Sequence, residues 1–148
     1  MSTLDLTADL IDVRDIIARF EELDEAREAL RTEFDEIEAN EGVDFDNWER
    51  NQIGYDEDEA QERAMLESLL AELNGMGGDE QWRGDWYPVT LIKDSYFEEY
   101  AQELAEDVGA VNKDAAWPNN CIDWTAAAEM LQQDYSTVDI GESTYWTR

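Results

Sequence analysis

The chain has 148 residues, of which 39 are acidic and ten are basic, so its formal net charge at pH 7 is −29. This charge excludes direct binding to DNA, RNA or an anionic membrane, because their phosphates would repel it. Hydrophobic residues make up 43% of the sequence and aromatic residues 11%, which is typical of a folded domain and unlike a disordered acidic tail.

The sequence of the N-terminal half predicts two helices. Residues 8–40 carry apolar side chains every three or four positions, the pattern of one long amphipathic helix, with Thr7 as its N-cap. Residues 41–56 contain glycine and asparagine and predict a loop, and a second helix is expected over 57–74. Together they predict an acidic helical hairpin over residues 1–75, which could also serve as a coiled-coil or dimer element.

A glycine-rich linker is predicted over residues 76–86, followed by a C-terminal domain over 87–148. The glycines follow a helix and do not stand between a strand and a helix, so they form no nucleotide-binding fingerprint. At the start of the C-terminal domain, residues 87–93 predict a short strand with Pro88 at its edge.

Two more helices and a hairpin are predicted in the C-terminal domain. The first helix covers residues 95–108 and opens with a capping box from Ser95 to Glu98. The second follows its N-cap Asp123 and runs to residue 134, and residues 136–146 alternate as a β-hairpin does. The predicted fold class is α+β, mostly α, with a short antiparallel sheet.

The aromatic residues of the C-terminal half are expected to pack in its core, because a stacking platform for single-stranded nucleic acid would need a basic groove. These residues are Trp82, Trp86, Tyr87, Trp117, Trp124, Tyr135, Tyr145 and Trp146.

Several kinds of chemistry are not expected. The chain has no histidine and a single cysteine, Cys121, so we expect no zinc, copper or iron–sulfur site, no disulfide and no serine or cysteine triad. Cys121 is expected to be a small buried hydrophobe. Asp44 and Asp46 begin like a calcium loop, but Trp48 stands where the third ligand should be. We therefore expect no metal, no cofactor and no enzymatic activity.

The first ten residues contain no basic stretch and no long apolar run, which are the marks of a signal peptide. No segment approaches the ~18 apolar residues of a membrane span. We therefore expect a cytoplasmic protein.

The negative charge itself suggests a function. Residues 1–75 hold 24 acids against six arginines and no lysine. Carboxylates three or four residues apart on a helix lie ~5–6 Å from each other, a suitable step for imitating phosphates. This pattern predicts a DNA mimic whose partner is a basic DNA-binding surface. The acids expected to stand in for phosphates are Asp44, Asp46, Glu49, Asp56, Glu57, Asp58, Glu59 and Glu62, followed by Glu21, Glu25 and Glu28 on the first helix.

The stretches "DSYFEEYAQELAEDVGA" and "WPNNCIDWTAAAEMLQQDYSTVDIGESTYW" resemble the C-terminal part of ArdA-type antirestriction proteins, over roughly residues 86–148. The matching features are Phe97, Tyr100, Ala101, residues 122–124, Ala127, Ala128, Asp134, Tyr135 and residues 144–146. That family consists of elongated, dimeric mimics of B-form DNA, made by phages and mobile elements, that occupy the DNA-binding groove of type I restriction–modification enzymes. The resemblance implies the same broad task here, in the cytoplasm of a bacterial host, with a homodimer as an open expectation.

Three alternatives stay open at this point. The target could be a CRISPR effector, which is a different DNA-handling defence. The chain could instead be an acidic adaptor or chaperone for a basic protein, which would bind its client without competing with DNA. It could also be adapted to high salt, where lysine is scarce, and Lys93 and Lys113 are the only lysines here.

Overall fold

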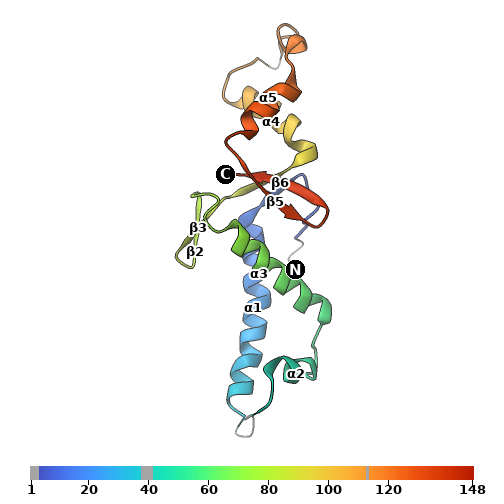
Figure 1. Ribbon diagram of the computed structural model, residues 1–148, viewed down its shortest axis with the longest axis vertical. Coiled ribbons are helices and arrows are strands. Elements are labelled where there is room, and N and C mark those ends of the chain that lie inside the picture. The colour runs from blue at the N-terminus through green and yellow to red at the C-terminus, as the bar shows by residue number, and fades with distance from the viewer. Residues whose placement is uncertain (1–3, 38–41, 113) are drawn as a thin grey trace. The chain divides into compact units, whose positions relative to one another are not determined.

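The computed structural model describes residues 4–37, 42–112 and 114–148 (Figure 1). As predicted, the chain is an α+β protein. It divides into two compact units. Residues Arg14–Ala71 form the first, called the helical unit, and residues Asp5–Val13 together with Glu72–Arg148 form the second, called the sheet unit.

The first helix, α1 (Val13–Asp35), is shorter than predicted. Residues Leu10–Asp12 are not helical but form strand β1, which pairs with residues 90–92. Thr7 does not cap α1, because the helix begins six residues after it, and its hydroxyl donates a hydrogen bond to Asp5 instead. Strand pairing with a distant segment thus outweighs the local helical pattern at this end. The predicted last turn, residues 38–40, lies outside the described residues.

A short helix, α2 (Phe45–Arg50), interrupts the segment predicted to be a loop, whose first residue lies outside the described residues. The ring of Phe34 on α1 lies 5.4 Å from Phe45 and 5.3 Å from Trp48, measured between ring centroids. This contact explains why six residues become helical despite their weak local signal: packing of an apolar face stabilises short helices more than propensity does.

The second predicted helix is confirmed as α3 (Glu57–Leu73). Asp56 caps it by accepting hydrogen bonds from the backbone of Asp58 and Glu59, and Gly75 follows its end with φ of +86°. In Figure 1, α3 crosses α1. The buried apolar residues of the helical unit are Ile16, Ile17, Phe20, Leu23, Phe34, Phe45, Leu66, Leu69 and Leu70.

The main sheet of the sheet unit has the strand order β1-β4-β6-β5 and is antiparallel throughout. Strands β5 (Ser136–Ile140) and β6 (Ser143–Thr147) are the predicted hairpin, and β4 (Thr90–Lys93) falls within the predicted strand. The buried Tyr145 donates its hydroxyl proton toward the carbonyls of Leu6 and Ala8, at 3.0 and 2.8 Å, and so ties the start of the chain to β6.

The segment predicted to be a linker contains a second, two-stranded sheet, β2 (Glu80–Trp82) with β3 (Asp85–Tyr87). Arg83 and Gly84 connect the strands, with φ of 51° and 84°. Two positive φ values in a two-residue connection are typical of the tight turns that join twisted strands. Gly84, one of the glycines that suggested a linker, is therefore part of a hairpin turn.

Two helices pack against the main sheet, α4 (Phe97–Asp107) and α5 (Trp124–Gln132). The capping box predicted at the start of α4 is wrong: a 3-10 turn precedes the helix, and Glu98 accepts a hydrogen bond from Thr125 instead. Asp123 caps α5 as predicted, accepting from the backbone of Ala126 at 3.1 Å.

The core between these helices and the sheet is partly aromatic. Ile92, Phe97, Ala101 and Ala128 are buried, with Tyr96, Tyr100, Leu131, Tyr135 and Trp146 packed against them. The expectation that all aromatic residues of this half are core residues is wrong for Trp86 and Trp117, which are 50% and 75% exposed. Cys121 is also exposed and not buried as predicted.

Within the described ranges, the model contains no helix with the length and apolar character needed to cross a membrane.

Candidate functional site

All eleven acids predicted to imitate phosphates lie in the helical unit. They come from exposed positions of α1, from α2 and the residue before it, and from the first turns of α3 and the residue before it. Three of them form ion pairs with arginine, and the other eight are exposed to solvent. This division decides which of them can offer a negative charge to a binding partner.

Three of the predicted acids are held by arginines of α1. Arg27 contacts Asp46 at 3.0 Å and Glu49 at 3.4 Å. The guanidinium of Arg19 donates two hydrogen bonds to Glu62, of 2.8 and 3.0 Å, and these bonds raise the pKa of Arg19. Arg27 carries one positive charge against the two carboxylates that it contacts, so these ion pairs offset only part of the negative charge of the three acids. The pairs also join α2 and α3 to α1.

A fourth pair of this kind was not predicted from the sequence. Arg63 on α3 contacts Asp24 on α1 at 2.6 Å, and both side chains are largely buried. Burial lowers the pKa of Arg63, but the hydrogen bond and charge of Asp24, assisted by Glu67, outweigh it and raise the pKa overall. The guanidinium also lies 5.3 Å from the ring centroid of Phe20. Nothing local in the sequence marks this pair, because its members are 39 positions apart.

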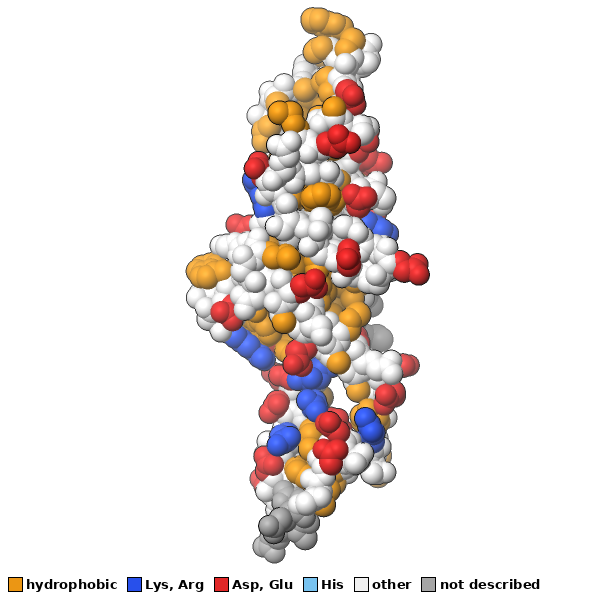
Figure 2. Space-filling view, viewed as in Figure 1, with side chains coloured by type: hydrophobic (Ala, Val, Ile, Leu, Met, Phe, Trp, Pro, Cys, Tyr) orange, Lys and Arg blue, Asp and Glu red, His pale blue; other side chains and the backbone are white. Residues whose placement is uncertain are grey.

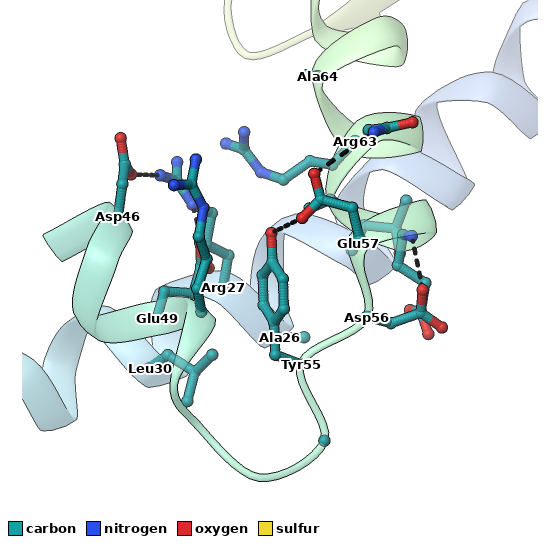
Figure 3. A pocket seen from close by; sticks show the side chains of 16 residues that line it. Ala26, Arg27, Leu30, Asp46, Glu49, Tyr55, Asp56, Glu57, Arg63 and Ala64 are labelled. Atoms are coloured by element: carbon teal, nitrogen blue, oxygen red, sulfur yellow. Dashed lines mark hydrogen bonds and ion pairs between the residues drawn. The ribbon is translucent and has the colours of Figure 1, made fainter.

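A cavity of about 380 Å³ lies among the three helices (Figure 3). Ala26 and Leu30 contribute apolar surface, and Tyr55 stands beside them. The Tyr55 hydroxyl donates to Glu57 at 2.7 Å, which raises the pKa of Tyr55 and lowers the pKa of Glu57. The charged residues that line the cavity are Arg27, Arg50, Arg63, Asp46, Glu49, Asp56, Glu57 and Glu59.

This lining mixes both signs, and Arg27 and Arg63 are already engaged by carboxylates of the helical unit. The cavity therefore holds no excess positive charge for an anionic ligand. Its rim belongs to the same acidic face as the predicted site.

The remaining eight predicted acids are exposed to solvent. Within the described parts of the chain, Glu25, Glu28, Asp44, Asp58 and Glu59 are exposed and form no ion pair. Asp56 and Glu57 are also exposed, although they accept hydrogen bonds from α3 and from Tyr55, as described above. Glu21 is exposed as well.

The sheet unit carries a second acidic face that the sequence reasoning missed. All acids of α4 are exposed, and Glu99, Glu103 and Glu106 follow one another at spacings of four and three, which places them on one side of the helix. Residues 94–147 contain 12 acids and one basic residue, Lys113. That imbalance is visible in the sequence and could have identified this face.

A hydrogen bond helps to orient this face. The Tyr96 hydroxyl donates to Glu103 at 2.8 Å and its own pKa is raised as a result. The helix itself is fixed by the buried side chains of Phe97 and Ala101. The carboxylates of α4 are therefore displayed from a rigid element.

Among the residues that the structure describes, no group of three or more acidic or cysteine side chains is placed to hold a metal ion. Comparisons with protein-family models, curated proteins and solved structures give no match to this chain. Fold and surface together define an α+β protein whose helices display rows of carboxylates.

Proposed function

We propose that this protein is a DNA mimic that inhibits a DNA-binding defence enzyme of a bacterial host, a restriction–modification enzyme, by occupying its DNA site. The observation that carries the proposal is the presence, in each unit, of exposed carboxylates on helices that form no ion pair with another described residue. Glu25 and Glu28 on α1 and Glu99 and Glu106 on α4 are the clearest examples. The mechanism is electrostatic occupation without turnover.

The spacing of these carboxylates supports the proposal. Side chains three or four positions apart on a helix are separated by ~5–6 Å, which is close enough for one basic groove to contact several of them. A groove that binds DNA carries lysine and arginine side chains at comparable intervals to meet the phosphates. Because the helices are already formed, little ordering is needed when the partner binds.

The exposed carboxylates would act together. Each exposed contact between a carboxylate and a lysine or arginine contributes only ~0.2–1 kcal/mol. A single substitution should therefore change the affinity by less than about fivefold. If one alanine substitution abolished inhibition, distributed mimicry would be wrong and one specific contact would be responsible.

The test uses a purified type I restriction–modification enzyme and, in parallel, a Cas effector complex, which is the alternative target. We expect the protein to inhibit DNA cleavage at a fixed stoichiometry and to be displaced by duplex DNA. Inhibition should weaken as salt is raised, because exposed charges are screened. Binding that DNA does not displace would indicate an adaptor, and no binding to either enzyme would favour adaptation to high salt.

Two triple variants locate the contribution of each unit. Asp44→Asn with Asp58→Asn and Glu59→Gln neutralises the helical unit, and Glu99→Gln with Glu103→Gln and Glu106→Gln neutralises α4. We expect each set to weaken inhibition about tenfold, since three exposed contacts are lost. The matched control replaces the same three glutamates of α4 by aspartate, which keeps the charge and should keep most of the inhibition.

A further inference from the structure

The connection between α4 and α5 differs from the rest of the sheet unit in its charge. Residues 108–122 contain one lysine and one aspartate and are therefore neutral, although they lie within the acid-rich region described above. Two of its apolar side chains are exposed, Val108 to 68% and Trp117 to 75%. In Figure 2, hydrophobic side chains gather at the end of the sheet unit where this connection lies in Figure 1.

The described part of this connection is held by hydrogen bonds. The side-chain amide of Asn119 donates to the carbonyl of Asn112 at 2.6 Å. The backbone of Asn120 donates to Ala116 at 2.8 Å, which closes a turn around Trp117. A side chain displayed on such a turn loses less conformational freedom on binding than one on an open loop. Trp117 is therefore presented in a defined position.

An exposed tryptophan on a fixed turn is a feature of protein-binding surfaces. Tryptophan buries a large apolar area, and it is enriched among the few residues that dominate binding energy at interfaces. Leaving the ring of Trp117 in water is unfavourable for the isolated chain, and the fold leaves this residue 75% exposed. The ring is therefore available to a partner.

The charges around the connection identify the partner. Exposed acids stand next to it at the end of α4, Glu106 and Asp107, and within or just after it, Asp114 and Asp123. A second copy of the chain would bring the same acids to the interface and would be repelled. Nucleic acid and an anionic membrane would be repelled as well. A protein pocket that is apolar inside and bordered by lysine or arginine would fit both the ring and its acidic surroundings.

We infer that Trp117 is an apolar anchor that inserts into such a basic-bordered pocket on the enzyme that the acidic faces bind. This inference rests on the proposed function and adds a second kind of contact to it. The carboxylates provide attraction that salt weakens, whereas burial of the indole ring provides affinity that salt does not screen.

The test measures the affinity of the full chain for whichever of the two enzymes it inhibits, over a series of salt concentrations. We expect Trp117→Ala to weaken binding about 30-fold at every salt concentration, which is typical of an interface hot spot, without changing the salt slope. Trp117→Phe should restore part of the loss. The matched control is Trp86→Ala, which removes another exposed tryptophan from the same unit and should change affinity less than twofold.

The outcomes separate this inference from the proposed function. If the unmutated chain binds, DNA displaces it, and Trp117→Ala binds equally well, the anchor is refuted and the mimicry stands. If Trp117→Ala changes only the oligomeric state in sedimentation, the ring contacts a second copy and the inference is wrong. If the unmutated chain binds neither enzyme, the proposed function fails and the anchor fails with it.

Discussion

Arg63 contacts two carboxylates that differ in burial and in position: Asp24 on α1 accepts two hydrogen bonds from it, and Glu67 on its own helix accepts one. Its contact with Asp24 joins side chains that are 15% and 14% exposed, whereas Glu67, at 2.9 Å, is 59% exposed. Removing one partner of a buried pair costs ~3–5 kcal/mol. Since Glu67 still contacts Arg63, we expect Asp24→Asn to lower the free energy of unfolding by about 2–3 kcal/mol. For Glu67→Gln we expect less than about 0.5 kcal/mol.

The two variants control for each other. Both remove one negative charge from a strongly acidic chain and so relieve the same general repulsion. Urea unfolding would be followed by helical circular dichroism and by the signal of Trp48, the only tryptophan among residues 14–71, in protein labelled with 5-fluorotryptophan. Equal changes for the two substitutions would refute the reasoning, because the contacts would then not depend on burial. A larger loss for Glu67→Gln would refute it as well.

Two further predictions concern the sheet unit. Gly77→Ala should destabilise it by about 1–3 kcal/mol, because an added Cβ would lie 2.7 Å from Cα of Pro88 and 2.8 Å from the carbonyl oxygen of Arg148. The control is Gly78→Ala, because nothing lies within 4 Å of a Cβ added there. Equal thermal unfolding midpoints for the two variants would contradict the prediction. Burial, assisted by the hydroxyl of Tyr100, raises the pKa of Tyr135 to about 12. The contribution of the neutral Tyr135 side chain to stability is therefore complete below about pH 10 and is lost as the pH rises toward 12. Absorbance titration should show one tyrosinate fewer in this pH range for Tyr135→Phe. An unchanged titration curve would show that Tyr135 ionises in another pH range.

The sequence was informative where the signals were local. The leucines of α3 and the alternation around the β5–β6 turn lie within a few residues of one another, so periodicity located both elements. The cap of α5 was equally visible, because Asp123 and Ala126 are three positions apart.

Elements that depend on distant partners could not be found in this way. Strand β1 has three residues and exists through its pairing with residues 90–92. Helix α2 depends on Phe34, which precedes it by more than ten residues. Local patterns contain no information about such partners, and tertiary contacts override them.

The sequence shows where acidic residues are dense in the candidate site, but it does not show which of these acids form ion pairs. The density of acids in residues 44–62 is plain in the sequence. Which of them are neutralised depends on contacts such as Arg19 with Glu62, 43 positions apart. The exposure of Trp117 was equally hidden, because burial depends on tertiary packing and the residue was expected in the core with the other aromatic residues of this half.

Because residues Asp5–Val13 belong to the sheet unit, the segment Arg14–Ala71 of the helical unit lies between two stretches of the sheet unit in the chain. Strand β1 is synthesised first, but its neighbour β4 follows only after the whole helical unit. The central strand β6 is later still, so the sheet cannot be completed until nearly the entire sequence has left the ribosome. The helical unit can fold during translation, while β1 still lacks its partner strand β4. A fragment that starts at residue 72 would lack an edge strand, and a permuted chain that joins residues 5–13 to it would restore the sheet.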